Sequence, residues 1–317
     1  MRILNLEPEG YAAEARGILS SLGEVVELAC SRVELLQQVA DAEVLIVRLG
    51  HTIDAEVLQN APYLRVIVTA TTGLNHIDTL AAQAQGIAVL SLRGERAFLN
   101  NITATAEHTW GLLLALVRNL TSATGHVCKR RWDRDRFKGR QLSGLTLGVV
   151  GLGRLGSIVA EYAHAFRMRV VAYDAAPVAS ASHIEMIPLS DLLACSDVVC
   201  LLVSYQPSSH LLISGREFAL MKRGAVLVNT SRGEVLDEAA LLYALRCGSL
   251  AGAALDVLSG EGDRAANWLD SHPLVEFARE SDRLLITPHI GGATFDSMAK
   301  AEVFMARKLL SYFSEGA

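Results

Sequence analysis

The chain has 317 residues, which at roughly 100 to 200 residues per domain predicts two domains. Hydrophobic residues make up 51% of it and charged residues 20%, with a mean hydropathy of +0.29, and this composition excludes a disordered chain. The formal net charge of −5 gives no overall positive field, so neither nucleic acid nor a membrane surface is an expected partner. Small molecules are the ligands that we expect.

Neither a membrane span nor a secretion signal is expected. The longest apolar stretches fall far short of the roughly 20 residues that cross a bilayer. The opening MRILNLEPEG has a single arginine and an interrupted apolar run, unlike a signal peptide. The cysteines include no CxxC pair, and their odd number predicts reduced core thiols in a cytoplasmic protein. They are Cys30, Cys128, Cys195, Cys200 and Cys247.

Short β-branched runs alternate with amphipathic segments along the first hundred residues. The expected strands are 3–6, 25–28, 44–47, 66–69 and 87–90. The expected helices between them are 12–22, 33–39 and 77–85. A second series of expected strands comprises 145–150, 169–173, 198–203, 226–229, 252–255 and 284–287. The alternation predicts an α/β fold with two Rossmann-like or flavodoxin-like parallel-sheet domains and a cleft between them.

Three further segments stand outside this alternation. The segment 103–120 is apolar on more than one helical face, which predicts a helix buried on several sides that bridges domains or subunits. The segment 294–313 has the pattern of an amphipathic helix with its apolar positions at Phe295, Met298, Val303, Met305, Leu309 and Leu310. The basic segment 129–140, KRRWDRDRFKGR, has interleaved acids and no nucleic-acid-binding motif, which favours a solvated loop or a subunit contact.

A glycine-rich turn lies between an expected strand and an expected helix at 154–166. Gly151, Gly153 and Gly156 have GxGxxG spacing. The first glycine permits a tight turn, the second lets backbone N–H groups approach a pyrophosphate, and the third lets helix and strand pack closely. Because the helix N-terminus carries a partial positive charge, this context predicts dinucleotide binding.

Asp174 ends the following strand, about 20 residues after Gly151, where an acid that binds the ribose 2′-hydroxyl is expected. A carboxylate there repels a 2′-phosphate. Ala175, Ala176 and Pro177 supply no cation to hold one. The sequence therefore predicts NAD rather than NADP as the cofactor.

Several motifs in one order make the chain similar to the D-isomer-specific 2-hydroxyacid dehydrogenases over nearly its whole length. They are LSGLTLGVVGLGRLG (142–156), NTSRGEVLDEAALLYAL (229–245), AGAALDV (251–257), TPHIGGAT (287–294), TATTGLNHID (69–78) and ATAEHTWGLLLAL (104–116). The resemblance implies a substrate domain of residues 1–98 completed by 292–317, and an NAD-binding domain of residues 99–291. It also implies a homodimer built on the NAD-binding domains.

The resemblance also implies three catalytic residues. Arg232 would hold the substrate carboxylate and 2-oxygen, His289 would be the acid/base, and Glu261 would orient and charge the histidine. Gly262 follows Glu261 where the family usually has proline. If Glu261 is not the partner acid, the alternatives are Glu234, Glu238 and Asp263.

Hydride transfer to a 2-oxo carbon requires these residue types independently of the resemblance. Negative charge builds on the oxygen, and a guanidinium stabilises it while an imidazolium donates a proton. Arginine also grips a carboxylate with two parallel hydrogen bonds. Each residue has a plainer interpretation, in which Arg232 lies in a surface turn, His289 ends a strand and Glu261 is one acid of a loop.

The glycine turn and Asp174 are expected cofactor contacts on the residues themselves, the resemblance adds the other contacts, and no metal is expected. The full set of expected cofactor contacts is Gly151, Gly153, Arg154, Leu155, Gly156, Asp174, Val203, Ser204, Thr230, Ser231, Arg232, Asp256, His289, Gly291 and Thr105. The loop 201–212 has Leu202, Ser204 and Gln206 in place of the family's His-x-Pro-x-Thr pattern. Asp256 has an alternative role as a strand cap.

Substrate binding is expected from the backbone N–H groups of a loop that contains Thr72, Gly73 and Leu74, and from Arg48. Arg48 would reach a second anionic group, or would instead form an ordinary ion pair. The leading hypothesis is an NAD-dependent dehydrogenase of a small D-2-hydroxy acid. The alternatives are an NAD-sensing co-repressor-like regulator and a dehydrogenase of a phosphorylated or inorganic substrate.

Overall fold

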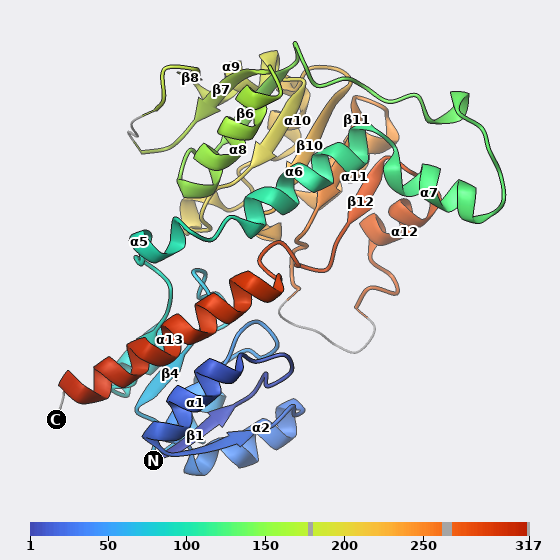
Figure 1. The fold of residues 1–317 in the computed structure, drawn as a ribbon. Helices are drawn as coiled ribbons and strands as arrows, with labels where there is room; N and C mark the ends of the chain where they lie inside the picture. The colour runs from blue at the N-terminus through green and yellow to red at the C-terminus, as the bar shows by residue number, and fades with distance from the viewer. Residues whose placement is uncertain (177–179, 262–267, 316–317) are drawn as a thin grey trace. The chain divides into compact units, whose positions relative to one another are not determined.

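The strands of the computed structural model form two parallel sheets, in the part of the chain that it describes (residues 1–176, 180–261 and 268–315). Each sheet belongs to its own unit (Figure 1). Unit 1 is Met1–Ile102 with Ala293–Ala317, and unit 2 is Thr103–Gly292. Within the same described ranges, no helix is long and apolar enough to cross a membrane.

The unit boundaries differ by a few residues from the predicted ones, which ended the first segment at residue 98 and resumed it at 292. The short helix α5 (Arg96–Leu99) accounts for the first difference, because it packs in unit 1. Phe98 stacks on Phe304 with ring centroids 4.2 Å apart, and Leu99 is buried.

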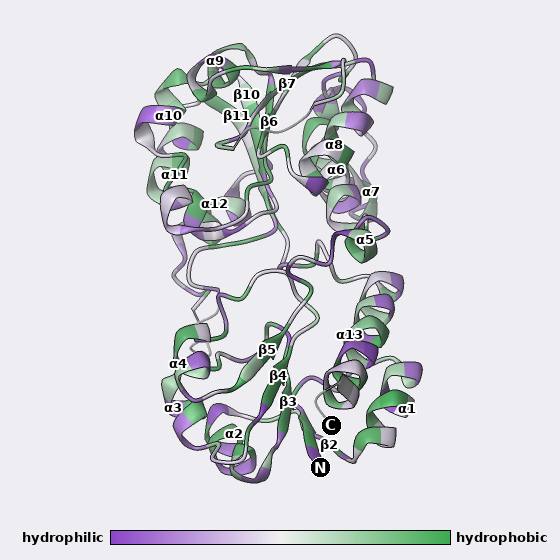
Figure 2. Ribbon diagram, turned by 90° about the vertical axis from the view of Figure 1, so that its left-hand side faces the viewer, coloured by the Kyte–Doolittle hydropathy of each residue, from purple (hydrophilic) through white to green (hydrophobic). Residues whose placement is uncertain are grey.

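The sheet of unit 1 has the strand order β2-β1-β3-β4-β5, which is the flavodoxin-like order. Its strands are β1 (Arg2–Asn5), β2 (Glu24–Glu27), β3 (Val44–Ile46), β4 (Val66–Val68) and β5 (Ala88–Leu90). The helices are α1 (Ala13–Leu22), α2 (Arg32–Gln38), α3 (Ala55–Gln59), α4 (Thr79–Ala84) and α13 (Phe295–Glu315). Figure 2 shows α1 and α13 on one face of the sheet and α2, α3 and α4 on the other.

Both faces of this sheet are covered, so its central strands are apolar throughout rather than alternating. Helix α13 packs against α1 and buries Met305 and Leu309. The predicted apolar face of this helix is wrong at Phe295 and Leu310, which are 97% and 38% exposed. Glu302, which the pattern left among the polar positions, is fully buried.

The sheet of unit 2 has the order β12-β11-β10-β9-β6-β7-β8, a doubly wound arrangement whose strand order reverses between β6 and β9. Its strands are β6 (Thr146–Val150), β7 (Arg169–Tyr173), β8 (Ile184–Met186), β9 (Val198–Leu201), β10 (Ala225–Asn229), β11 (Leu250–Leu255) and β12 (Leu284–Ile286). In sheets of this kind, ligands bind outside the carboxyl ends of the strands at the reversal point.

Helices cover both faces of this second sheet. They are α6 (Ala104–Val117), α7 (Leu120–Cys128), α8 (Arg154–Ala165), α9 (Leu189–Cys195), α10 (Gly215–Leu220), α11 (Glu238–Arg246) and α12 (Pro273–Glu280). Figure 2 shows α6 and α8 on one face and α9 to α12 on the other. As predicted, α6 is buried on several sides, since it packs against α8 and three strands. Its predicted end at residue 120 is wrong, because Asn119 adopts a left-handed conformation with φ 53° and α7 begins after it.

The cysteines are free thiols, as expected; Cys30 and Cys195 pack against the cores while only partly buried. Cys200 is buried in β9, and burial raises the pKa of its thiol to about 12. Cys128 and Cys247 are exposed, because they stand at the ends of α7 and α11. The prediction of core thiols therefore holds for Cys200 and fails for these two.

Candidate active site

The glycine-rich turn follows β6 and is shaped by close backbone contacts. Gly151 has φ 96°, and a Cβ there would lie 2.8 Å from the backbone of Leu202 and Val203. A Cβ on Gly156 would lie 2.1 Å from the carbonyl oxygen of Gly151. The turn therefore requires glycine at both positions, and the first turn of α8 packs directly against it.

Gly153 differs from these two glycines, because it faces open space. It is the N-cap residue of α8, it is exposed, and a Cβ there would meet nothing within 4 Å. The backbone N–H groups at the start of α8 are thus accessible to an anion at the positive end of the helix dipole. These residues fit the pyrophosphate of a dinucleotide. Arg154 and Leu155 begin the helix, and burial lowers the pKa of Arg154.

Asp174 lies beside this turn, at the carboxyl end of β7. Its carboxylate accepts hydrogen bonds from the backbone N–H of Leu152 at 2.9 Å and of Ala176 at 3.0 Å. The aspartate therefore ties the glycine turn to β7, and its remaining lone pairs can accept a ribose hydroxyl. Pro177, which the NAD prediction also used, lies outside the described residues.

More of the predicted cofactor contacts follow the neighbouring strands. Val203 and Ser204 come after β9, and Thr230 and Ser231 come after β10. The Thr230 hydroxyl is 2.7 Å from that of Thr109, and the Ser231 hydroxyl donates to Asn229 Oδ1 at 2.7 Å. Thr105, in the first turn of α6, lies against Gly291, where a Cβ would come within 3.3 Å of its methyl group.

Arg232 follows β10 and is held by its neighbours. Its Nη1 donates to the Ser231 carbonyl at 2.7 Å, and its own carbonyl accepts from Asn229 Nδ2 at 3.0 Å. Burial lowers the pKa of the guanidinium, while the carboxylates of Glu261 and Glu234 act against that shift. Arginine nevertheless stays protonated in proteins, so the side chain is a fixed positive charge in this site.

Gly233 lets the loop of Arg232 approach the loop that carries Glu261. A Cβ at this glycine would lie 2.1 Å from both Leu258 C and Ser259 N. The two loops therefore touch backbone to backbone. Gly233 stands in the 229–245 motif, but the motif alone predicted no role for it.

His289 and Glu261 form a direct pair, in which His289 Nδ1 bonds to Glu261 Oε1. Both side chains are mostly buried. Glu261 Oε2 also accepts from the backbone N–H of Leu258 at 3.3 Å. Because Nδ1 faces the glutamate, Nε2 is the ring nitrogen left to exchange a proton with a ligand.

The backbone of His289 is strained. Its φ of 52° is left-handed, which for a residue other than glycine costs roughly 1–3 kcal/mol unless the surroundings hold it. Its N–H donates to the Asp256 carbonyl at 2.8 Å. Strain of this kind is typical of functional sites.

Asp256 organises the segment around His289. It is 2% exposed, and its carboxylate accepts from Ile290 N at 2.9 Å and from Gly291 N at 2.7 Å. It also bonds to the Thr287 hydroxyl at 2.6 Å and lies 3.1 Å from His108 Nε2. These contacts match the strand-cap alternative for Asp256, and its predicted cofactor contact stays a prediction. His108 stands in the 104–116 motif, yet nothing in the sequence singled it out.

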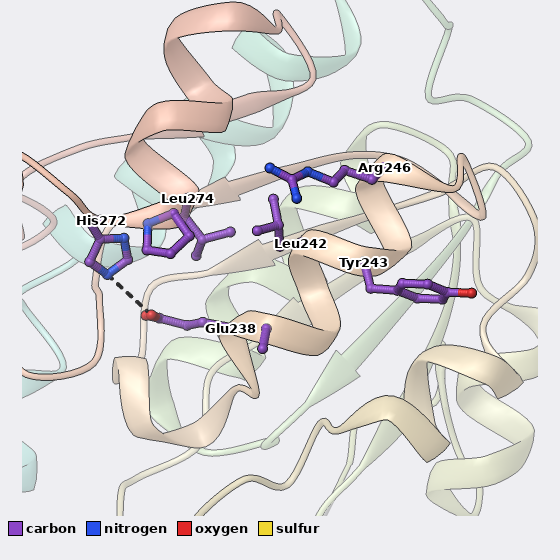
Figure 3. A pocket seen from close by; sticks show the side chains of 8 residues that line it. Glu238, Leu242, Tyr243, Arg246, His272 and Leu274 are labelled. Carbon is purple, nitrogen blue, oxygen red and sulfur yellow. Dashed lines mark ion pairs between the residues drawn. The ribbon is translucent and has the colours of Figure 1, made fainter.

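Within the described ranges, neither Glu234 nor Glu238 pairs with His289. Glu238 pairs instead with His272, at 3.3 Å from Glu238 Oε2 to His272 Nε2. This pair borders a cavity of about 450 Å³ between α11 and α12, which Figure 3 shows from close by. Asp263 and Gly262 lie outside the described residues.

The four predicted substrate-binding residues lie in unit 1. Thr72, Gly73 and Leu74 form a loop after β4 that is held by a bond of 2.8 Å from the Thr71 hydroxyl to the Gly73 carbonyl. Arg48 forms ordinary ion pairs, which was the alternative to its predicted contact with substrate. Its partners are Glu7 at 3.3 Å and Glu302 at 3.0 Å.

Three features together define the class of dinucleotide-binding proteins with an acid–base pair next to a fixed positive charge. They are the doubly wound sheet, the glycine turn and the group of Arg232, Glu261 and His289. Residues 110–291 match the family described as "D-isomer specific 2-hydroxyacid dehydrogenase, NAD binding domain". The chain belongs to this family, as the sequence motifs predicted.

Relatives and solved structures agree with this assignment. A D-3-phosphoglycerate dehydrogenase of Methanocaldococcus jannaschii is 36% identical over 301 residues, 93% of this chain and 55% of that protein. A crystal structure of a Thermus thermophilus protein has 34% identity and a TM-score of 0.86, covering 99% of this chain and 97% of that one. A D-lactate dehydrogenase of Aquifex aeolicus, complexed with NAD and lactic acid, has 29% identity and the same TM-score, covering 100% and 96%. The chain spans about half the length of the curated relatives it matches.

Proposed function

We propose that this protein is an NAD-dependent oxidoreductase that interconverts a small D-2-hydroxy acid and the corresponding 2-oxo acid. The observation that carries the proposal is the direct Glu261–His289 pair, with Nε2 of the histidine left for a substrate oxygen. The fixed charge of Arg232, whose loop touches that of Glu261 through Gly233, supports it further. Family membership supports the same activity.

The residues divide the reaction among them. Bound nicotinamide supplies or accepts the hydride at C2 of the substrate. Arg232 binds the substrate carboxylate and stabilises the charge that develops on the 2-oxygen. In the direction of reduction, His289 donates a proton from Nε2 to that oxygen, and Glu261 stabilises the protonated imidazole and fixes its orientation.

Arg48 bears on the substrate class. Its side chain is 18% exposed, and Glu7 and Glu302 neutralise its charge. A second anionic group on the substrate would have to displace these carboxylates. We therefore favour substrates with a single carboxylate, such as the lactic acid of the Aquifex aeolicus complex, over phosphorylated acids.

The direct test is a panel of 2-oxo acids scored by NADH oxidation. The panel holds glyoxylate, hydroxypyruvate, pyruvate, 2-oxoglutarate, phosphohydroxypyruvate and longer 2-oxo acids. We expect turnover of at least one monocarboxylate, and a loss of ~10²-fold or more in kcat for His289→Asn with NADH affinity nearly unchanged. Tight NADH binding without turnover of any acid would favour an NAD-sensing regulator instead.

The proposed assembly is a homodimer in the cytoplasm, built on the NAD-binding domains. The segment after α6 supports a subunit contact there, since Trp132 is 89% exposed and Leu120 and Val127 are each 50% exposed. Apolar side chains gathered on a surface are typical of protein–protein interfaces. Sedimentation of wild-type protein and of Trp132→Ala tests this arrangement.

A further inference from the structure

Two acid–histidine pairs flank the Glu261–His289 pair, and neither belongs to the assigned catalytic machinery. We propose that His108 and His272 are positioning residues, each of which holds a mostly buried carboxylate that anchors one partner of the proton-transfer pair. Asp256 with His108 anchors the segment of His289, and Glu238 with His272 anchors the segment of Glu261. This inference rests on the proposed function.

The first anchor acts on the strained turn at His289. Asp256 accepts from both N–H groups that follow the histidine, at Ile290 and Gly291, and its own carbonyl accepts the N–H of His289. Asp256 N in turn donates to Asn229 O at 2.9 Å, which ties the turn to β10 and the loop of Arg232. A shift of Asp256 would therefore move the imidazole of His289.

His108 completes the environment of this buried carboxylate. Its Nε2 lies 3.1 Å from Asp256 Oδ1 and 3.0 Å from the Thr287 hydroxyl. Because the Thr287 hydroxyl donates to Asp256, it can only accept from His108, so Nε2 carries the hydrogen. His108 stands on α6, which is buried on several sides and gives it a rigid base. Without this donor, a nearly inaccessible charge loses one of its partners.

The second anchor acts on the loop of the glutamate. Glu238 Oε1 accepts the N–H of Ser259 at 2.7 Å, two residues before Glu261, and Oε2 faces His272 Nε2. Glu238 is the first residue of α11, and His272 is the N-cap of α12, so two helices define the position of the loop. Burial raises the pKa of Glu238, while the Ser259 N–H and His272 favour its charged form.

His272 contacts Glu238 through a single ring nitrogen. Its Nδ1 is buried and has no hydrogen-bond partner among the described residues, so Nε2 makes the side chain's one polar contact, with Glu238. Figure 3 shows the two side chains facing one another at the edge of the cavity. Proton transfer demands placement of its partners to well under 1 Å, and misplacement by about 1 Å lowers rates ~10²-fold.

The test compares substitutions that keep or remove the Nε2 donor. Glutamine places an amide N–H near the position of Nε2, whereas leucine fills the space without a donor. We expect His108→Leu and His272→Leu to lower kcat about 10-fold or more, with KM for NADH within about 2-fold of wild type. His108→Gln and His272→Gln should recover most of kcat. His164→Leu, in the exposed last turn of α8, is the control and should leave kcat unchanged.

A second measurement does not depend on turnover. The Nδ1–H of His289 bonded to Glu261 should give a downfield imidazole proton resonance in the free protein, identified by its loss in His289→Asn. Each leucine variant should broaden or shift this resonance, and each glutamine variant should restore it. Leucine variants that keep both kcat and the resonance, or glutamine variants as impaired as leucine, would overturn the proposal. A wild-type protein without turnover would refute the proposed function alone, since the resonance would still report on the anchors.

Discussion

The proposed role of Glu261 is the most sharply testable one, because the side chain touches His289 and would act through it. An ionised glutamate stabilises the protonated imidazole that reduction requires. Glu261→Gln removes that charge and with it the stabilisation of the protonated imidazole. The alkaline limb of the kcat profile for reduction should therefore move to lower pH, with a smaller loss at acidic pH. Steady-state rates over a pH series measure this shift.

Arg232→Ala is the matched control for this pH profile. The guanidinium does not titrate in the accessible range, so its removal should lower kcat/KM at every pH without moving either limb. If Glu261→Gln leaves the alkaline limb in place, the contact with His289 is structural, and Asp263 becomes the acid to test.

Asp174 sets a second prediction, on cofactor choice. Its carboxylate holds the Leu152 and Ala176 N–H groups, can accept a ribose hydroxyl and repels the negative charge of a 2′-phosphate. We expect kcat/KM to favour NADH over NADPH by at least ~10², about 2.7 kcal/mol. Asp174→Ala should narrow this ratio mainly by weakening NADH, since the ribose 2′-hydroxyl of NADH loses its acceptor.

Asp174→Asn separates charge from shape at the same position. Asparagine keeps an acceptor oxygen and removes the negative charge. We therefore expect kcat/KM for NADPH to rise more in Asp174→Asn than in Asp174→Ala. Equal use of both cofactors by the wild-type protein would contradict this account of the ribose site.

Sequence patterns located the chemistry-bearing residues but not the residues that hold them. Arg232 and His289 stand in recognisable motifs, and Glu261 follows at the expected spacing. His108 and Glu238 carry no such signal, because a histidine on an apolar helix and a glutamate at a helix start are common in any protein. Their roles depend on contacts across large sequence separations, such as the one between His108 and Asp256.

At the scale of elements, the glycine turn and α8 give a prediction that separates folding from ligand binding. Gly156→Ala would place a Cβ 2.1 Å from a backbone oxygen, so it should destabilise unit 2 by several kcal/mol or prevent its folding. A Cβ at Gly153 would meet nothing, and the residue has an ordinary φ of −78°. Gly153→Ala should therefore preserve stability, while its methyl group obstructs the approach of NADH to this backbone and weakens NADH binding. Denaturant unfolding and NADH titration measure the two effects.

Gly111→Ala provides the baseline for these two variants. Gly111 lies inside α6, and a Cβ there would meet nothing within 4 Å. Alanine in a helix interior should be stabilising by up to about 1 kcal/mol, with no effect on NADH. A Gly153→Ala protein that binds NADH as tightly as Gly111→Ala would show that no ligand approaches this backbone.

The predicted elements agree best with the structure where a segment is buried along its whole length. The predicted strands are recognisable because they are apolar runs, and the structure moves their ends by up to two residues, shortening some, such as β9, and lengthening others, such as β11. The short helices α3 and α5 and the edge strand β8 were missed, since each has too few residues for a periodic pattern. The break at Asn119 was missed because the apolar pattern continues on both sides of it.

At the scale of the whole molecule, the topology of unit 2 explains how a site forms from distant segments. The sheet is parallel, so the carboxyl ends of β6, β7, β9, β10, β11 and β12 lie along one edge. The glycine turn, Asp174, the loop of Arg232, Asp256 and the segment of His289 each follow one of these strands. Alternation of strands and helices predicted this sheet, whereas the backbone contact at Gly233 required the three-dimensional structure.

The proposed activity requires that hydride reach C2 of a 2-oxo acid on one face only. The most direct measurement follows NADH oxidation with the best 2-oxo acid of the panel and determines the configuration of the product by chiral chromatography. We expect one D-2-hydroxy acid to form for each NADH consumed, and both signals to be lost in His289→Asn. An L or racemic product, or NADH oxidation that persists in His289→Asn, would contradict it.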